Sequence, residues 1–163
     1  MMDFKNAREL LELCSENQCP ISAVMREREC DQGETTAEEA DDRMRRVLEI
    51  MRSSAYEPIE KPGKSMGGLI GGEARKLSAR RENGKVVCGT VMSRAITYAM
   101  AVLEVNSSMG LIVAAPTAGS SGIVPGLLLA LQEEYGLADD RLIDALYNAG
   151  AIGYLAMRNA TVA

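Results

Sequence analysis

Apolar side chains recur at intervals of three and four residues along most of the chain, which is the spacing of one face of an α-helix. In the first third, residues 3–17 predict an amphipathic helix capped by Asp3, and Pro20 stands where a second helix can begin. Thr36 and Glu39 have the spacing of a capping box. The helix that this box opens is expected to run to about Tyr56.

Residues 57–72 are rich in glycine and proline and are predicted to form a loop, because neither residue type favours a long helix. Only two short stretches, 85–88 and 111–114, could form strands, so the pattern predicts an all-α fold. The last helix is expected to place Leu142, Leu146, Ala149 and Ile152 on one face. The helices expected after the loop cover residues 73–81, 90–108, 123–135 and 138–158.

The length of 163 residues suits one helical domain, covering residues 1–163, and is too short for two full domains. The formal net charge of −5 argues against a nucleic-acid or anionic-membrane surface, because such partners need concentrated lysine and arginine. Residues 1–5 lack the apolar core of a signal peptide, and the uncharged stretch 95–103 is too short to span a bilayer. These features predict a cytoplasmic protein, where its four cysteines would stay reduced.

The most distinctive segment is a loop of small residues at 115–126 that leads into an apolar helix. Small side chains leave backbone N–H groups accessible, and a helix N-terminus presents unpaired donors. Thr117, Ser120 and Ser121 add hydroxyl groups beside those amides. The segment can therefore bind a carboxylate or a phosphate. Alternatively, Ser120 or Ser121 only caps the helix while the glycines allow close packing, and the spacing leaves both interpretations open.

A second segment of small residues, 64–72, leads into the helix expected at 73–81. Lys64 supplies a positive charge and Ser65 a hydroxyl group, but the glycine spacing is not that of a nucleotide-binding P-loop. The alternative interpretation is a flexible connector between two helical layers.

These two segments belong to a longer series of short segments with a common order along the chain. The most specific is Pro-Thr-Ala-Gly-Ser-Ser-Gly at 116–122, and the others lie at 64–77, 104–110, 149–153 and 159–161. Together they resemble the alpha chain of bacterial iron–sulfur L-serine dehydratase over nearly the whole chain. Glu73 stands where an aspartate is common in that family.

The resemblance implies an enzyme that converts L-serine to pyruvate and ammonia, with a part in amino-acid metabolism and gluconeogenesis. In that family a [4Fe–4S] cluster binds the substrate hydroxyl, and an enzyme base removes the α-proton. The loops of small residues would then hold the carboxylate of L-serine. The expected partner is a beta chain or a fused regulatory domain, and the expected assembly is a homo- or hetero-oligomer.

We expect the substrate site to form where the two loops face each other. Backbone amides, hydroxyl groups and one lysine together suit a carboxylate. Asn106 is expected within reach, because only a short segment separates it from Pro116. The sequence does not identify the catalytic base. The predicted substrate-binding residues are Lys64, Ser65, Asn106, Thr117, Gly119, Ser120, Ser121 and Gly122.

No metal or cofactor is expected in this chain. Cys14, Cys19 and Cys30 have a spacing unlike that of cluster-binding motifs, and the sequence has no histidine. The resemblance places the cluster cysteines beyond Ala163, so the chain is expected to be the N-terminal part of the catalytic subunit and inactive by itself. Two other interpretations are an all-α module that binds a small carboxylate or a phosphate without catalysis, and a purely structural subunit.

Overall fold

The computed structural model describes residues 2–84 and 86–159. Within these residues the chain forms seven α-helices, one short 3₁₀ helix and no strand, which confirms the all-α prediction. In the same part of the chain, no helix is both long enough and apolar enough to cross a membrane. The elements are α1 (Ala7–Glu16), α2 (Ile21–Gly33), α3 (Ala37–Glu60), α4 (Glu73–Glu82), α5 (Thr90–Ser107), η1 (Ala118–Ser120), α6 (Ile123–Tyr135) and α7 (Asp139–Asn159).

The chain groups into two compact units, and the single helical domain over residues 1–163 stays a prediction. Unit 1 contains the described residues up to Arg46 and from Asp139 onward, and unit 2 is Val47–Ala138. One boundary lies within α3, so this helix contributes residues to both units.

Helices that begin and end on strong local signals lie where they were predicted. α4, α5, α6 and α7 each begin and end within one residue of the expected bounds. Gly136 ends α6 with a left-handed backbone (φ 62°), which glycine adopts without steric cost. The capping box also forms: the Glu39 amide donates to Thr36 Oγ1 at 3.2 Å, and the Thr36 amide donates to Glu39 Oε2 at 3.0 Å.

The predicted start of the first helix is wrong. α1 begins at Ala7, and its cap is Asn6, whose side-chain oxygen accepts from the Glu9 amide at 3.0 Å. Asp3 instead pairs with Arg28 at 3.1 Å. Phe4 is buried and meets Tyr154 edge to face, with ring centroids 5.4 Å apart. These tertiary contacts hold the chain before Asn6 outside the helix.

The predicted start of the glycine- and proline-rich loop is also wrong. α3 continues through Pro58 to Glu60, so the loop begins at Lys61 rather than at Glu57. A proline removes one helical hydrogen bond. Here the proline is buried in the last turn, and the Lys61 amide still donates to the Glu57 carbonyl at 2.8 Å.

Two smaller points concern the candidate strands and the predicted buried face of α7. Residues 86–88 and 111–114 form no strand, while Lys85 lies outside the described residues, as do Ala160 and Thr161 of the family-like segment 159–161. Leu142 and Leu146 are buried as predicted, but Ile152 is 59% exposed, because the buried face of α7 continues through Ile143, Tyr147 and Ala151 and is turned away from Ile152.

Unit 1 consists of α1, α2, the first part of α3 and α7. α2 packs against both α7 and α1. The Arg28 guanidinium is buried and lies 3.9 Å from the centroid of the Tyr154 ring. The apolar core of this unit comprises Phe4, Leu10, Val24, Met25, Ala40, Leu142, Ile143, Leu146, Tyr147 and Ala151.

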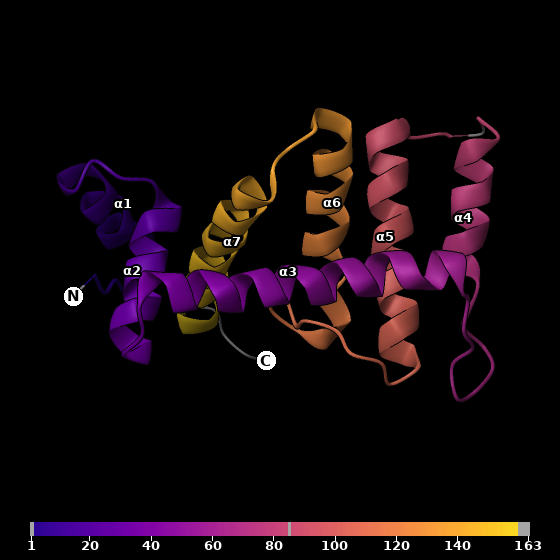
Figure 1. The fold of residues 1–163 in the computed structure, drawn as a ribbon, viewed down its shortest axis with the longest axis horizontal. Helices are drawn as coiled ribbons and strands as arrows, with labels where there is room; N and C mark the ends of the chain where they lie inside the picture. Colours follow the sequence, from indigo (N-terminus) through magenta and orange to yellow (C-terminus); the bar gives the residue numbers. More distant parts are fainter. Residues whose placement is uncertain (1, 85, 160–163) are drawn as a thin grey trace. The chain divides into compact units, whose positions relative to one another are not determined.

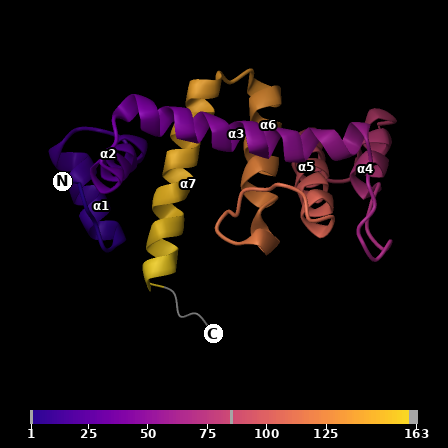
Figure 2. The same ribbon diagram turned by 60° about the horizontal axis from the view of Figure 1, so that its bottom comes forward.

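Unit 2 carries the predicted site. α4, α5 and α6 lie side by side in both views, with the second part of α3 running across them (Figures 1 and 2). The α3 residue Tyr56 meets Tyr98 of α5 edge to face, with ring centroids 5.1 Å apart. The apolar core of this unit comprises Leu48, Met51, Ala55, Ala74, Tyr98, Ala101, Val102, Leu129 and Ala130.

One carboxylate joins three helices of unit 2. The hydroxyl groups of Tyr56 and Tyr98 both donate to Glu133 Oε1, at 3.0 and 2.5 Å, and Arg94 Nε lies 3.1 Å from Glu133 Oε2. Burial, together with the Glu133 charge and hydrogen bond, raises the pKa of Tyr56 to about 12. Burial and the hydrogen bond to Glu133 also raise the pKa of Tyr98.

This cluster predicts a loss of stability at alkaline pH. Because both pKa values are higher in the folded than in the unfolded state, the stabilisation is complete below about pH 10 and is lost as the pH rises toward 12. Urea unfolding at pH 8 to 12 should show a shallower alkaline loss in the variant Tyr56→Phe/Tyr98→Phe than in the unmodified chain. Replacement of the exposed Tyr135 by phenylalanine serves as the control. Parallel losses in all three proteins would contradict the prediction.

Candidate functional site

The two loops of small residues lie at the same end of unit 2. The first loop, residues 61–72, leads into α4, and the second loop, residues 108–122, connects α5 to α6. Figures 1 and 2 show both loops at the end of the helical layer where α4 and α6 begin and α5 ends. A shared anion pocket would require the two loops to lie at the same end, and the pocket itself stays a prediction.

The first loop is folded back on itself. The Ser65 amide donates to the Ile70 carbonyl at 2.7 Å, and the Ile70 amide donates to Ser65 Oγ at 3.1 Å. Gly71 has a φ of +147°, and a Cβ atom placed on it would lie 2.1 Å from the Gly63 carbonyl oxygen. The two ends of the loop are therefore in contact beside Lys64, whose side chain is exposed. The Ser65 hydroxyl shapes the loop.

Two carboxylates, neither of them among the predicted site residues, occupy the start of α4. The amides of Gly72 and Ala74 donate to Glu104 of α5, at 2.9 Å to Oε2 and 2.7 Å to Oε1. The Gly71 amide donates to Glu73 Oε2 at 2.6 Å, and this hydrogen bond is the largest cause that lowers the pKa of Glu73. The sequence offers one signal for Glu104. It is an acidic residue in a largely apolar helix, and such a residue needs a partner if it is buried.

The hydroxyl groups of the second loop are bonded within the loop. Thr117 and Ser120 form a reciprocal capping box at η1, and Ser120 Oγ also donates to the Ala115 carbonyl at 3.1 Å. Ser121 is 1% exposed, and its hydroxyl donates to the Ala118 carbonyl at 2.7 Å. Neither serine caps α6, whose cap residue is Gly122 with no side-chain hydrogen bond.

The two predicted glycines of the second loop have different surroundings. Gly122 is buried, and a Cβ atom placed on it would lie 2.5 Å from the Ala99 carbonyl oxygen of α5. Gly119 is exposed, and its amide makes no hydrogen bond to the residues that the structure describes. Gly122 thus allows close helix packing, whereas Gly119 presents a backbone donor.

Asn106 connects the last turns of α5 to the second loop. Its side-chain amide donates to the Ala118 carbonyl at 3.2 Å. Glu104, two residues earlier, holds the start of α4. The same end of α5 therefore contacts both loops, although the side-chain amide of Asn106 is directed at the protein backbone.

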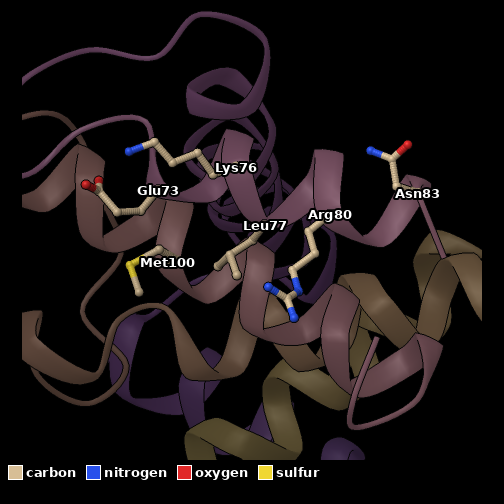
Figure 3. A pocket seen from close by; sticks show the side chains of 6 residues that line it. All are labelled: Glu73, Lys76, Leu77, Arg80, Asn83 and Met100. Atoms are coloured by element: carbon tan, nitrogen blue, oxygen red, sulfur yellow. The ribbon is translucent and has the colours of Figure 1, made fainter. Parts of the chain in front are cut away.

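A groove between α4 and α5 begins next to the first loop and has a volume of about 650 Å³. Figure 3 shows Glu73 at one end and Asn83 at the other, with Leu77 between them. None of the predicted site residues lines it. The lining residues are Glu73, Lys76, Leu77, Arg80, Asn83 and Met100.

The described cysteines do not fit the iron–sulfur cluster that the resemblance implies. Cys14, Cys19 and Cys30 lie in unit 1 and Cys88 in unit 2, and all four are free. Burial is the largest cause that raises the pKa of the Cys14 and Cys30 thiols, which disfavours the thiolate form that binds metals. Among the described residues, no group of three or more histidine, cysteine or acidic side chains could hold a metal ion.

Comparison with known proteins identifies the family. The family model described as serine dehydratase alpha chain matches residues 16–163. The probable L-serine dehydratase alpha chain of Bacillus subtilis (strain 168) is 38% identical over 159 residues, which cover 98% of this chain and 53% of that relative. The L-serine dehydratase alpha chain of Peptoniphilus asaccharolyticus is 33% identical over 160 residues, which cover 98% of this chain and 55% of the relative.

A longer protein named L-serine dehydratase is also similar to this chain. The L-serine dehydratase of Streptomyces coelicolor (strain ATCC BAA-471 / A3(2) / M145) is 32% identical over 165 residues, which cover 98% of this chain and 35% of the relative. The chain thus spans about half the length, or less, of these relatives. Since the family model matches most of the chain, this protein belongs to the serine dehydratase alpha chain family.

Proposed function

We propose that this chain supplies the carboxylate-binding loops of an enzyme that converts L-serine to pyruvate and ammonia. The relatives named L-serine dehydratase support the substrate. The observation that carries the proposal is that both loops are bound to the same end of α5, where Glu104 binds the start of α4 and Asn106 binds the second loop. Each loop alone could be explained by the close packing that its small residues allow.

We propose two roles for the predicted site residues, which are contact with the substrate and support of the loops. The exposed Gly119 amide and the Lys64 ammonium group are the donors proposed to contact the carboxylate of L-serine. The hydroxyl groups of Ser65, Ser120 and Ser121 support the shapes of the loops. Thr117 completes the capping box of η1, Gly122 packs against α5, and Asn106 ties the second loop to that helix.

The proposal assigns the rest of the chemistry to the complete enzyme. The [4Fe–4S] cluster would be held outside this chain, because its described cysteines do not fit a cluster. The beta chain or fused regulatory domain would be a further part of the enzyme, and the catalytic base is not assigned. Within that enzyme, the residues described here bind and orient the substrate. A cytoplasmic setting and a part in gluconeogenesis belong to the same proposal, and the four free cysteines suit a reducing compartment.

The test uses this chain assembled anaerobically with a polypeptide that corresponds to the remaining length of the relatives' alpha chains. We expect formation of pyruvate that depends on L-serine. Lys64→Met should raise KM for L-serine about tenfold and change kcat less than about twofold, because a contact made equally in ground and transition states affects binding alone. Lys61→Met, three residues away in the same exposed loop, is the matched control.

Other outcomes would contradict the proposal. Pyruvate formation with an unchanged KM in Lys64→Met would remove this lysine from the site. Binding of L-serine or phosphate by calorimetry, with no pyruvate from the assembled protein, would favour the module that binds anions without catalysis. Absence of both binding and turnover would favour the purely structural subunit.

A further inference from the structure

Glu104 is an acidic residue in the interior of unit 2, with a side chain that is only 4% exposed. A buried carboxylate is costly unless its oxygen atoms are hydrogen-bonded. Both oxygens of Glu104 accept from backbone amides, Oε1 from Ala74 at 2.7 Å and Oε2 from Gly72 at 2.9 Å. These amides form the positive end of the α4 dipole, so the charge is stabilised where it lies.

The contact between Glu104 and Gly72 extends to Lys64 through the backbone of the first loop. Gly72 follows Gly71, which approaches the Gly63 carbonyl so closely that no Cβ atom would fit between them. The same Cβ atom would lie 2.9 Å from the Lys64 Cα atom. A shift at the start of α4 would therefore move Lys64 as well.

The last turns of α5 also hold the second loop, through the hydrogen bond from Asn106 to the Ala118 carbonyl. Residue 118 immediately precedes Gly119, whose exposed amide is the other proposed donor. Two side chains on one helix thus hold the backbones of the two loops that carry the ammonium group and the amide proposed to bind one carboxylate.

We infer that Glu104 is a positioning residue that holds the first loop, and with it Lys64, in register with the second loop. This inference rests on the proposed function, because the register matters only if both loops contact one substrate. The amides at the N-terminus of α4 bind the carboxylate of Glu104 and are therefore not free to bind the substrate. The substrate carboxylate is accordingly bound at the second loop rather than at the start of α4.

Two conservative variants test the inference in this chain. Glu104→Asp keeps the charge but shortens the side chain by one methylene group, so its oxygens reach both amides only if the start of α4 moves. Glu104→Gln keeps the length but places an NH₂ donor against an amide donor. In both, we expect hydrogen exchange at the Gly72 and Ala74 amides to accelerate by about tenfold or more. Glu60→Gln, an exposed acid at the end of α3, should leave exchange unchanged.

The kinetic test uses the assembled enzyme at a temperature where every variant is folded. We expect Glu104→Asp to raise KM for L-serine about tenfold while kcat falls by less than about threefold, because the loops are displaced but the reacting groups are not. Unchanged exchange, or faster exchange with an unchanged KM, would overturn the inference while the proposed function stands. Absence of pyruvate formation by the unmodified enzyme would instead defeat the proposed function, and the inference with it.

Discussion

Replacement of Gly122 by alanine is expected to destabilise unit 2 by about 3 kcal/mol, the upper part of the range for overpacked interiors. A Cβ atom at this position would lie 2.5 Å from the Ala99 carbonyl oxygen and 3.0 Å from the Ala99 Cα atom. These are backbone atoms of α5, so no side-chain rotation can relieve the clash. Urea unfolding followed by circular dichroism measures the effect, and the melting temperature should fall by about 10 °C.

The matched control is Gly119→Ala, three residues earlier in the same loop. The nearest atom to a Cβ at Gly119 is Thr117 Oγ1, at 3.9 Å, so this variant should stay within about 0.5 kcal/mol of the unmodified chain. Gly126→Ala should resemble Gly122→Ala, because its Cβ would lie 2.7 Å from the Ala95 carbonyl oxygen. Equal effects of the Gly122 and Gly119 replacements would contradict the division of roles between these two glycines.

These variants separate two interpretations that the sequence leaves open, because a glycine-rich loop can serve close packing or expose amides. The structure assigns close packing to Gly122 and an exposed amide to Gly119. Spacing alone could not do so, since the difference depends on where α5 passes. In the sequence the two glycines are equivalent small residues on either side of two serines.

The helices that were predicted correctly are those whose ends carry local signals. The Thr36 and Glu39 box, the turn at Gly136 and the acidic first turn of α4 all act within a few residues, so a single sequence reveals them. Apolar periodicity then identifies the lengths of α5, α6 and α7.

The errors arise where a distant residue competes with a local preference. Asp3 has the chemistry of a helix cap, but Arg28 lies 25 residues away in the sequence and takes its carboxylate. Pro58 is a helix-breaking residue, yet burial in the last turn of α3 retains it within the helix. Neither the pairing of Asp3 with Arg28 nor the burial of Pro58 can be predicted from spacing along the chain.

The candidate site shows the same limit. The sequence identifies the loops and their residue types, while the directions of the side chains depend on tertiary contacts. Ser121 is turned inward to the Ala118 carbonyl, and Glu104 reaches a helix start that is 30 residues earlier. A buried acid is a stronger sign of such a contact than any loop composition, because its burial requires compensating donors.

In the part of unit 2 that the structure describes, several apolar side chains of α5 and α6 are exposed and define an apolar face. Tyr98 of α5 faces α3, and Ile96 lies about 200° around the helix from it, given about 100° per residue. The apolar side chains on this face of α5 and on the neighbouring face of α6 are between 38% and 64% exposed. They are Met92, Ile96, Leu103, Ile123 and Leu127. A patch of this kind favours association with another apolar surface.

We therefore expect the chain by itself to self-associate through this face. Ile96→Glu/Leu127→Glu should weaken self-association by about a hundredfold, because it places two charges in the centre of the contact. Sedimentation velocity over a range of concentrations measures the effect, and circular dichroism verifies that the variant is folded. Leu11→Glu, which replaces a more exposed leucine on α1, is the control and should leave the association unchanged. A monomer at every concentration, or an equal effect of the Leu11 replacement, would show that the α5 and α6 face does not drive association.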